Sequence, residues 1–228
     1  MENKPQFEAV IFDMDGVLIN SEPFWSIAEF EVFNRHGIQI SLEETNESMG
    51  IRLNDVVAMR KKQFPGCTTP DEIIVQETIN EVIRLIKTEG VCIEGIPELL
   101  ESLKLAGIKI GLATSSSPDL IDAVLEKLQI GHYFEAVSSA IFEKNGKPFP
   151  DVFLTTAQKL QIKPGNCIVF EDSPKGVQAA LRADMKVIVV NSNNLHPESF
   201  DKVGLIIETP ADLGKDEVAQ LFSFFANN

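Results

Sequence analysis

The chain has 228 residues, of which 44% are hydrophobic and 24% are charged, and its formal net charge is −14 at pH 7. This length and composition suit one large core, or one domain that carries a smaller inserted one, and they exclude a disordered or repetitive chain. The charge leaves no surplus of Lys and Arg to neutralise phosphates, so we expect neither nucleic acid nor an anionic membrane as a partner.

The N-terminal segment 1–8 is polar, with no apolar signal core behind it, and the apolar runs are as short as Val187-Ile-Val-Val190. Runs of this length suit strands rather than membrane spans. The three cysteines are odd in number and far apart, which favours reduced thiols over a disulfide framework: Cys67, Cys92 and Cys167. We therefore expect a cytoplasmic protein, and the acidic charge is compatible with a monomer.

Four short apolar runs predict strands that alternate with helices. They cover residues 9–12, 108–113, 167–170 and 186–190, and amphipathic segments follow them. Ser117-Pro118 and Ser173-Pro174 mark helix starts a few residues after two of these strands. Such alternation predicts an α/β fold with helices on both faces of a parallel sheet. Open sheets of this kind bind ligands at the carboxyl ends of their strands.

Between the first two predicted strands the pattern is helix after helix. Residues 21–35 are predicted to be helical, residues 43–63 are predicted to be helical with a break near Met49-Gly50, and residues 70–88 form a long amphipathic pattern. This predicts a small helical domain, residues 20–90, that is inserted into a core domain of residues 1–19 and 91–228.

Two aspartates, Asp13 and Asp15, follow the first predicted strand. In an extended segment residues two apart point to the same side, so both carboxylates project toward one spot. Carboxylates this close repel each other, and one is protonated unless a cation compensates them. Because Asp15-Gly16 also fits an ordinary turn, the pair by itself leaves a turn and a functional site equally open.

Further polar residues lie at two other strand ends and in one loop. Residues 114–117 offer hydroxyls and amides near a helix start, which is a natural anion cradle, although such clusters are also common in loops. Glu171 and Asp172 are oxygen ligands that suit Mg²⁺, with a helix N-cap as the alternative for one of them. Lys147 could hold a carboxylate and a phosphoryl group together. Combined, these residues predict phosphoryl transfer to an aspartate.

In this order, the residues resemble the four motifs of the haloacid dehalogenase (HAD) superfamily of phosphotransferases: Asp13-Met-Asp-Gly16, Thr114, Lys147 and Glu171-Asp172. Residues 107–116, 146–153 and 169–178 look like its β-phosphoglucomutase-like branch, and the resemblance covers the whole chain. It implies a Rossmann-like core sheet and a helical cap that closes over the site and excludes water.

The resemblance also implies roles for the first two aspartates. Asp13 would be the nucleophile and a Mg²⁺ ligand. Asp15 would bind Mg²⁺ through its backbone carbonyl, while its side chain protonates the leaving alcohol and then activates the hydrolytic water. Haloalkanoate dehalogenases resemble this pattern but lack the second aspartate, because a halide leaving group needs no proton. Asp15 therefore favours phosphate chemistry.

The remaining motifs receive roles from the same resemblance. Thr114 and neighbouring amides such as that of Ser115 would hold phosphoryl oxygens, and Lys147 would bridge the nucleophile and the phosphate. Asp172 would be the second metal carboxylate, and Glu171 would act on the metal directly or through water. No role is assigned to the three histidines, which lie outside the motifs: His36, His132 and His196.

Trp25 and Arg52 bear on the choice of reaction. Mutases of this branch carry a histidine where this chain has Trp25, which puts mutase activity in doubt. Residues 20–25 look instead like bacterial phosphatases that act on 2-deoxyglucose 6-phosphate and hexitol phosphates. Arg52, in a turn that matches their substrate-facing loop, is a candidate substrate contact, with an exposed arginine as the alternative. Trp25 is also a candidate contact, with a packed helix residue as the alternative.

The sequence thus predicts a Mg²⁺-dependent phosphatase of hexose or hexitol phosphates that works through an aspartyl phosphate. A β-phosphoglucomutase-type activity is the alternative. A third interpretation, a non-enzymatic response-regulator domain, also uses clustered acids, Mg²⁺, a hydroxyl and a lysine. The order of the motifs and the helical insert after the first strand oppose it.

Overall fold

The computed structural model describes residues 7–190 and 204–213. Its strands are β1 (Ala9–Phe12), β2 (Lys109–Thr114), β3 (Ala136–Ser139), β4 (Cys167–Glu171), β5 (Lys186–Val190) and β6 (Leu205–Ile207). They form one parallel sheet in the order β3-β2-β1-β4-β5-β6. The predicted α/β fold with a parallel sheet is confirmed. The two additional strands were not predicted, because β3 (AVSS) is half serine and β6 has only three residues.

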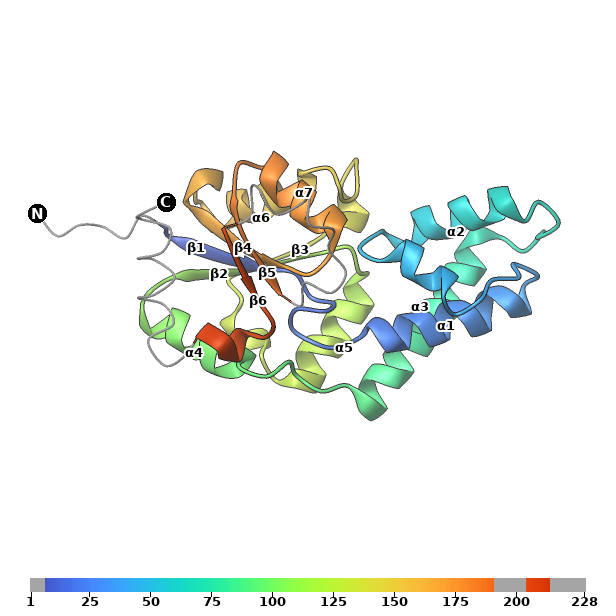
Figure 1. Cartoon of the computed structure of the whole chain (residues 1–228), viewed down its shortest axis with the longest axis horizontal. Helices are drawn as coiled ribbons and strands as arrows, with labels where there is room; N and C mark the ends of the chain where they lie inside the picture. Colours follow the sequence, from blue (N-terminus) through green and yellow to red (C-terminus); the bar gives the residue numbers. More distant parts are fainter. Residues whose placement is uncertain (1–6, 191–203, 214–228) are drawn as a thin grey trace, which may run out of the picture.

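Helices cover both faces of this sheet (Figure 1). In chain order they are α1 (Glu22–Arg35), α2 (Leu53–Gln63), α3 (Asp71–Glu89), α4 (Ile96–Leu105), α5 (Pro118–Leu128), α6 (Asp151–Leu160) and α7 (Pro174–Arg182). A 3₁₀ helix, η1 (Glu44–Ser48), precedes α2, so the predicted helix over 43–63 is broken near Met49-Gly50 as expected. Within the described residues, no helix combines the length and the apolar character that a membrane crossing requires.

The central strand shows why the sheet needs helices on both sides. Side chains along a strand alternate between its faces. In β1, Val10 and Phe12 belong to the apolar cluster that includes residues of α4 and α5, whereas Ala9 and Ile11 belong to the cluster that includes residues of α6 and α7. All four side chains are buried, which explains the uninterrupted apolar run in the sequence.

The helices α1, α2 and α3 lie together beyond one end of the sheet (Figure 1). They enclose a cluster of their own, made of apolar side chains such as Val32, Phe33, Val56, Val57 and Ile74. The chain leaves and re-enters the sheet region through two segments that meet, because Ile93 N donates to Leu18 O over 3.0 Å and Ile19 pairs with Cys92. This meeting point is where the predicted domain boundaries at 19/20 and 90/91 would lie, and those boundaries remain a prediction.

The strand order decides which strand ends become neighbours. β1 lies between β2 and β4, with Phe12 opposite Leu112 on one side and Phe170 on the other. Asp13, Thr114 and Glu171 each follow or end one of these strands, so their side chains are brought to the same edge of the sheet. This is the edge at which α/β sheets bind ligands.

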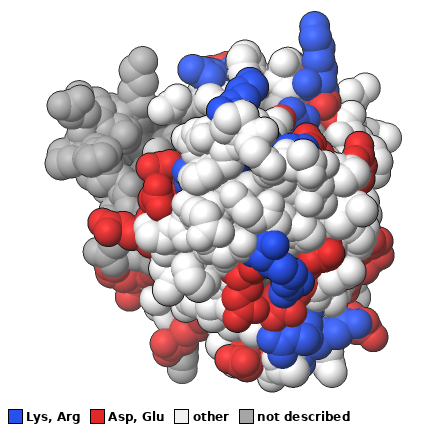
Figure 2. Space-filling model, turned by 90° about the vertical axis from the view of Figure 1, so that its right-hand side faces the viewer, with Lys and Arg blue, Asp and Glu red and all other residues white. Residues whose placement is uncertain are grey.

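The face at the helical end of the molecule carries charges of both signs (Figure 2). On this face, and for the described residues, basic side chains are interspersed with acidic ones and form no continuous basic surface. The expectation that nucleic acid is not a partner stays a prediction. His196 and residues 1–6 lie outside the described residues.

Candidate active site

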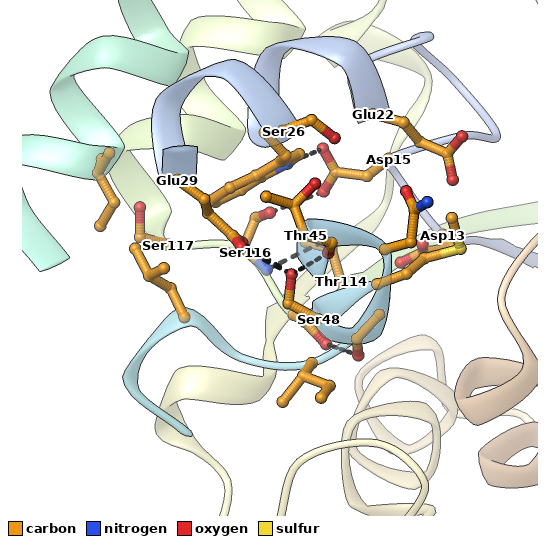
Figure 3. Close-up of a pocket in the computed structure, with 18 of the residues that line it drawn as sticks. Asp13, Asp15, Glu22, Ser26, Glu29, Thr45, Ser48, Thr114, Ser116 and Ser117 are labelled. Atoms are coloured by element: carbon orange, nitrogen blue, oxygen red, sulfur yellow. Dashed lines mark hydrogen bonds between the residues drawn. The ribbon is translucent and has the colours of Figure 1, made fainter. Parts of the chain in front are cut away.

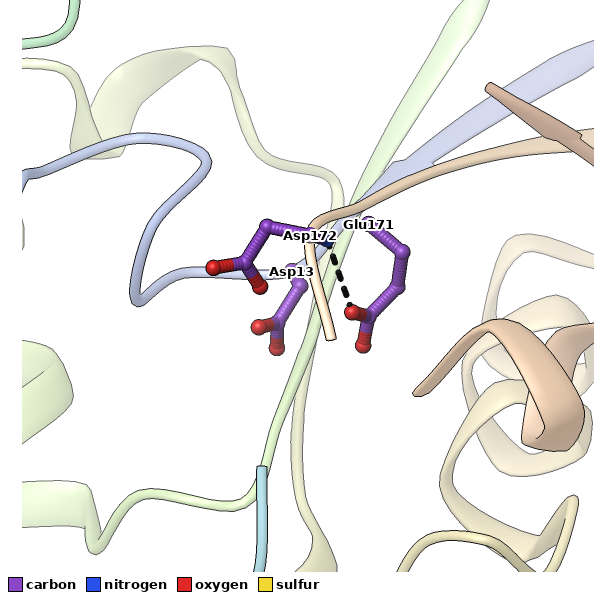
Figure 4. Close-up of side chains that lie close together, drawn as sticks. All are labelled: Asp13, Glu171 and Asp172. Atoms are coloured by element: carbon purple, nitrogen blue, oxygen red, sulfur yellow. Dashed lines mark hydrogen bonds between the residues drawn. The ribbon is translucent and has the colours of Figure 1, made fainter. Parts of the chain in front are cut away.

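Three carboxylates meet at the carboxyl ends of β1 and β4. Asp13, Glu171 and Asp172 are buried, and each has an oxygen within 4.8 Å of the others (Figure 4). The strand pairing explains this, because Asp13 N donates to Phe170 O over 2.9 Å and so fixes the two strand ends side by side. The pairing of β1 with β4 thus brings Asp13 and Asp172 together.

Lys147 lies within this acidic cluster. Its Nζ donates to Asp13 Oδ1 over 2.7 Å and to Glu171 Oε1 over 2.5 Å, and its side chain is 1% exposed. Burial by itself would lower the pKa of Lys147, but the charges of Asp13 and Glu171 raise it above its usual value. Lys147 is therefore a permanently charged link between two carboxylates, although it comes from a loop far away in the sequence.

One lysine does not compensate the charge of this cluster. Burial raises the pKa of Asp13 to about 8, against the opposing effect of Lys147, and Glu171 and Asp15 add to the increase. The pKa of Asp172 also lies well above its usual value, first because of burial and then because of Glu171 and Asp13. Several buried carboxylates with one cation are an environment in which a further cation is strongly favoured. Hard oxygen ligands of this kind suit Mg²⁺.

The hydrogen bonds of Glu171 set it apart from the other two acids. Its Oε2 accepts from Asp172 N and Ser173 N over 2.9 Å each and from Ser173 Oγ over 3.0 Å, while its Oε1 accepts from Lys147. Both oxygens of Glu171 are thus engaged by the protein. Asp13 and Asp172 keep more of their acceptor capacity for a metal ion.

Gly16 makes room for Asp172. Its φ is +75°, in the left-handed region, and a Cβ added to it would lie 1.8 Å from Asp172 Oδ2. A side chain at this position would therefore both strain the backbone and displace a candidate metal ligand. The glycine that suggested an ordinary turn in the sequence is also required for the close approach of the two strand ends.

The segment after β2 forms the predicted hydroxyl-rich loop before α5. Thr114 is buried, and its Oγ1 accepts a hydrogen bond from Ser116 N over 3.1 Å, which leaves the hydroxyl hydrogen to donate to an anion. Ser139 Oγ donates a hydrogen bond to Ser116 O over 2.6 Å. Ser115 Oγ donates instead to Gly50 O over 3.1 Å, so its side chain ties the loop to the helical part and only its amide stays a candidate for an anion.

Three side chains hold the carboxylate of Asp15. Ser21 Oγ and Trp25 Nε1 donate to its Oδ1 over 2.5 and 2.9 Å, and Ser116 Oγ donates to its Oδ2 over 2.7 Å. Figure 3 shows Asp15 at the edge of the pocket that Asp13, Thr114 and Ser116 also line. Trp25 lines the same pocket, but its one polar group is directed at Asp15. Trp25 is thus a packed helix residue that also donates a hydrogen bond to Asp15.

Arg52 points away from the pocket. Its Nη1 donates to the carbonyl oxygens of Ala140 and Glu143 over 3.1 Å each, and its Nε donates to Asp55 over 2.7 Å. Its neighbours Ile51 and Leu53 line the pocket, and Arg52 is not among the lining residues. In this arrangement Arg52 ties the helical part to the loop after β3, and the geometry gives no support to the predicted substrate contact.

Ser21, Ser116 and Glu29 line or support the pocket but were not predicted as site residues. Ser21 and Ser116 are separated in sequence by helices α1 to α4 and strand β2, and only the fold brings both to Asp15. A signal for Ser116 did exist, since the whole run 114–117 was predicted as an anion cradle. Glu29 lies mid-helix with no motif around it, so nothing local distinguishes it from a solvated helix residue.

We expect Trp25→Phe to lower kcat for a phosphate monoester by about tenfold, because a hydrogen bond to a charged group contributes about 1.5–3 kcal/mol. The aromatic ring remains, so KM should change less than kcat. Steady-state kinetics of Trp25→Phe and Ser116→Ala, which remove one donor each from Asp15, would test this role. A raised KM with an unchanged kcat in Trp25→Phe would show instead that the indole contacts the substrate.

Comparison with known proteins matches most of the chain to a known family. Residues 10–190 match the model of the "haloacid dehalogenase-like hydrolase" family. The chain is 34% identical over 191 residues to hexitol phosphatase B of Escherichia coli strain K12, covering 83% of this chain and 86% of the relative. It is 33% identical over 191 residues to a phosphorylated carbohydrates phosphatase of Thermotoga maritima, covering 82% and 87%.

A solved structure, a β-phosphoglucomutase from Clostridium difficile, has the same fold with a TM-score of 0.82 and 27% identity, covering 97% of this chain and 100% of that one. The matched residues include β1, β2 and β4 with the acids at their ends. Fold, acidic cluster and family match therefore agree, and the chain belongs to the haloacid dehalogenase-like hydrolase family.

Proposed function

We propose that the chain is a Mg²⁺-dependent phosphatase that hydrolyses small sugar phosphates, such as hexose or hexitol phosphates, through an aspartyl phosphate on Asp13. The observation that carries the proposal is the position of Asp13. It accepts a hydrogen bond from Lys147, lies within 4.8 Å of Asp172 through their carboxylate oxygens, and lines a pocket that also carries hydroxyl and amide side chains. Two of the relatives are named as a hexitol phosphatase and a phosphatase of phosphorylated carbohydrates, which supports a sugar phosphate as the substrate class.

In the proposed reaction an oxygen of Asp13 attacks phosphorus, and the bond between phosphorus and the ester oxygen breaks. Asp15 gives its proton to that leaving oxygen, so the alcohol departs neutral. Asp15 then takes a proton from water, whose oxygen attacks the phosphorus and releases inorganic phosphate from Asp13. Ser21, Trp25 and Ser116 orient Asp15 for both steps, and Thr114 and the loop amides hold the phosphoryl oxygens.

Asp13, Asp172 and the backbone carbonyl of Asp15 would hold the Mg²⁺ ion. When bound, the ion supplies positive charge to the phosphoryl oxygens and the carboxylates. We propose that Glu171 mainly positions Lys147, because both of its oxygens already accept hydrogen bonds. Lys147 lowers the pKa of Asp13 against the effect of burial and offsets its repulsion of the phosphate.

A phosphomutase activity is the alternative, because the fold is shared with a β-phosphoglucomutase. A mutase returns the phosphoryl group to a second position of the sugar instead of releasing it. Conversion of β-glucose 1-phosphate to glucose 6-phosphate with a bisphosphate primer, followed with a coupled dehydrogenase, would demonstrate it. A cytoplasmic location and a monomeric state also remain proposals, and size-exclusion chromatography tests the second.

Addition of Mg²⁺ should both activate and stabilise the protein. At about 100 times its Kd, a ligand that binds only the folded state adds about 2.7 kcal/mol to the free energy of unfolding. For a chain of this size that corresponds to roughly 5–10 °C in Tm. Phosphate release from a panel of sugar phosphates, with and without Mg²⁺, and thermal unfolding under the same conditions measure the two effects.

Asp172→Asn should abolish both responses to Mg²⁺, while the metal-free protein becomes as stable as the parent or more stable, because one repelling buried charge is gone. Asp122→Asn, at an exposed position of α5, is the matched control and should behave like the parent. Release of no phosphate from any sugar phosphate by the parent with Mg²⁺ would refute the proposed function.

A further inference from the structure

Glu29, on α1, is a buried acid that the proposed reaction does not use. It is 4% exposed and lines the pocket. In Figure 3 it lies on the side of the pocket away from Asp13, with its carboxylate toward Ser48. Ser48 Oγ lies 3.0 and 2.8 Å from its two oxygens and is the donor that the structure gives to Glu29. A carboxylate can accept several hydrogen bonds, so these bonds leave most of the acceptor capacity of this pocket-lining acid unused.

Among the described residues, no Lys or Arg forms an ion pair with Glu29. Arg60 is the basic residue that acts on its charge, but the Arg60 guanidinium bonds to Glu47 Oε2 over 3.0 Å and to Gln63 Oε1 over 3.1 Å. Burial raises the pKa of Glu29 to about 7, against the opposing effects of Ser48 and Arg60. Burying a carboxyl group with so few partners is costly unless a ligand supplies them.

Ser117 provides a second, independent observation on the same side of the pocket (Figure 3). Its side chain is buried, and its Oγ has no hydrogen-bond partner. It lines the pocket at the N-cap of α5. An unpartnered buried hydroxyl and an underused carboxyl thus occupy the end of the pocket opposite the nucleophile. Both are complementary to hydroxyl groups, which donate and accept hydrogen bonds.

The negative charge of the pocket disfavours a ligand with a second phosphate group. Its lining carries the acids Asp13, Asp15, Glu22, Glu29 and Asp172, and within the described part of the chain no Lys or Arg lines it. The phosphate at Asp13 is served by Lys147 beside that acid. A second phosphate at the far end would lie beside Glu29, and among the described residues no Lys or Arg lines the pocket to pair with it. Repulsion between like charges discriminates against a ligand as effectively as favourable contacts select for one.

We propose that Glu29 determines substrate specificity by accepting hydrogen bonds from hydroxyl groups at the end of the substrate away from its phosphate, and by repelling a second phosphate there. This inference rests on the proposed function and refines it. The favoured substrates are monophosphates of polyhydroxylated compounds, and sugar bisphosphates are disfavoured. Ser117 assists Glu29 by offering its own hydroxyl to the same hydroxyl groups of the substrate.

The test compares three phosphate monoesters in Glu29→Gln and in the parent, at a pH above the pKa of Glu29. They are hexitol 6-phosphate, glucose 1,6-bisphosphate and p-nitrophenyl phosphate, which has no hydroxyl group. Charge-assisted hydrogen bonds are about twice as strong as neutral ones, so kcat/KM for the hexitol phosphate should fall by about tenfold. The kcat/KM for p-nitrophenyl phosphate should stay within about twofold of the parent value. The preference for monophosphate over bisphosphate should shrink by about tenfold.

Glu31→Gln, at an exposed position of the same helix, is the matched control and should change none of these values. If Glu29→Gln does not fold, Ser117→Ala serves as a second variant. It should selectively lower kcat/KM for the hexitol phosphate. An equal loss on all three substrates, or no change on any, would overturn the role of Glu29. Failure of the parent to hydrolyse even p-nitrophenyl phosphate would instead refute the proposed function, so the two failures are distinguishable.

Discussion

Asp13→Asn is expected to lose phosphate release by about 10⁴-fold or more, because an amide cannot act as the nucleophile that carries the phosphoryl group. The change is isosteric, so the side chain still fits between Lys147 and the strand ends. It also removes one of several mutually repelling buried charges, and Tm without Mg²⁺ should therefore not fall. Phosphate release and thermal unfolding measured on the same preparation separate loss of chemistry from loss of fold.

Asp15→Asn provides the matching control for the nucleophile. It leaves Asp13 intact but removes the group that gives and takes the proton, so turnover should stop after the first transfer. With p-nitrophenyl phosphate, whose leaving group needs little protonation, this variant should release one equivalent of nitrophenol and keep the phosphoryl group. Mass spectrometry of the trapped protein would locate it on Asp13. Substantial hydrolysis by Asp13→Asn, or a phosphoryl group elsewhere, would contradict the assigned nucleophile.

Lys147→Met should destabilise the protein as well as inactivate it. Lys147 is 1% exposed and donates to Asp13 and Glu171, so its loss leaves two buried carboxylates without their shared cation. Removal of one partner from a buried ion pair costs about 3–5 kcal/mol. For a chain of this size the expected fall in Tm is therefore roughly 6–20 °C. Thermal unfolding without Mg²⁺ measures this effect most directly.

Two comparisons make the Lys147 prediction specific. Lys144→Met, in the same loop but exposed, should leave both Tm and activity close to those of the parent. Adding Glu171→Gln to Lys147→Met removes one of the uncompensated charges and should recover part of the lost stability without recovering activity. An unchanged Tm in Lys147→Met would show that the cluster does not depend on this lysine for its charge balance.

The local signals in this chain predicted much of the fold. The apolar runs at 9–12, 167–170 and 186–190 became β1, β4 and β5 within one residue, because fully buried parallel strands need such runs. The polar residues that follow the runs indicated the edge of the sheet that carries the site. The signal failed where burial is partial or the element is very short, as in β3 and β6.

Asp13, Asp15, Thr114, Lys147 and the two acids at the end of β4 were all predicted from the sequence as members of one site. Each of them sits in a motif with its own local meaning, such as a strand end, a helix start or a Pro-rich loop. Their order along the chain, compared with a family pattern, then linked the motifs. Such reasoning works because the chemistry of these residues requires particular residue types at particular places in a parallel sheet.

Only the tertiary structure decided what the side chains of the helical part do. Trp25 donates to Asp15, Arg52 donates to two carbonyl groups at the sheet, and Glu29 is buried. All three facts depend on how two distant parts of the chain meet. The sequence indicated the proposed nucleophile, its charge partners and the sheet that carries them, because strand periodicity and strand ends are local properties. Hydrogen bonds between groups far apart in the chain have no such local pattern, so the orientation of Asp15 and the polar far end of the pocket emerged only from the fold.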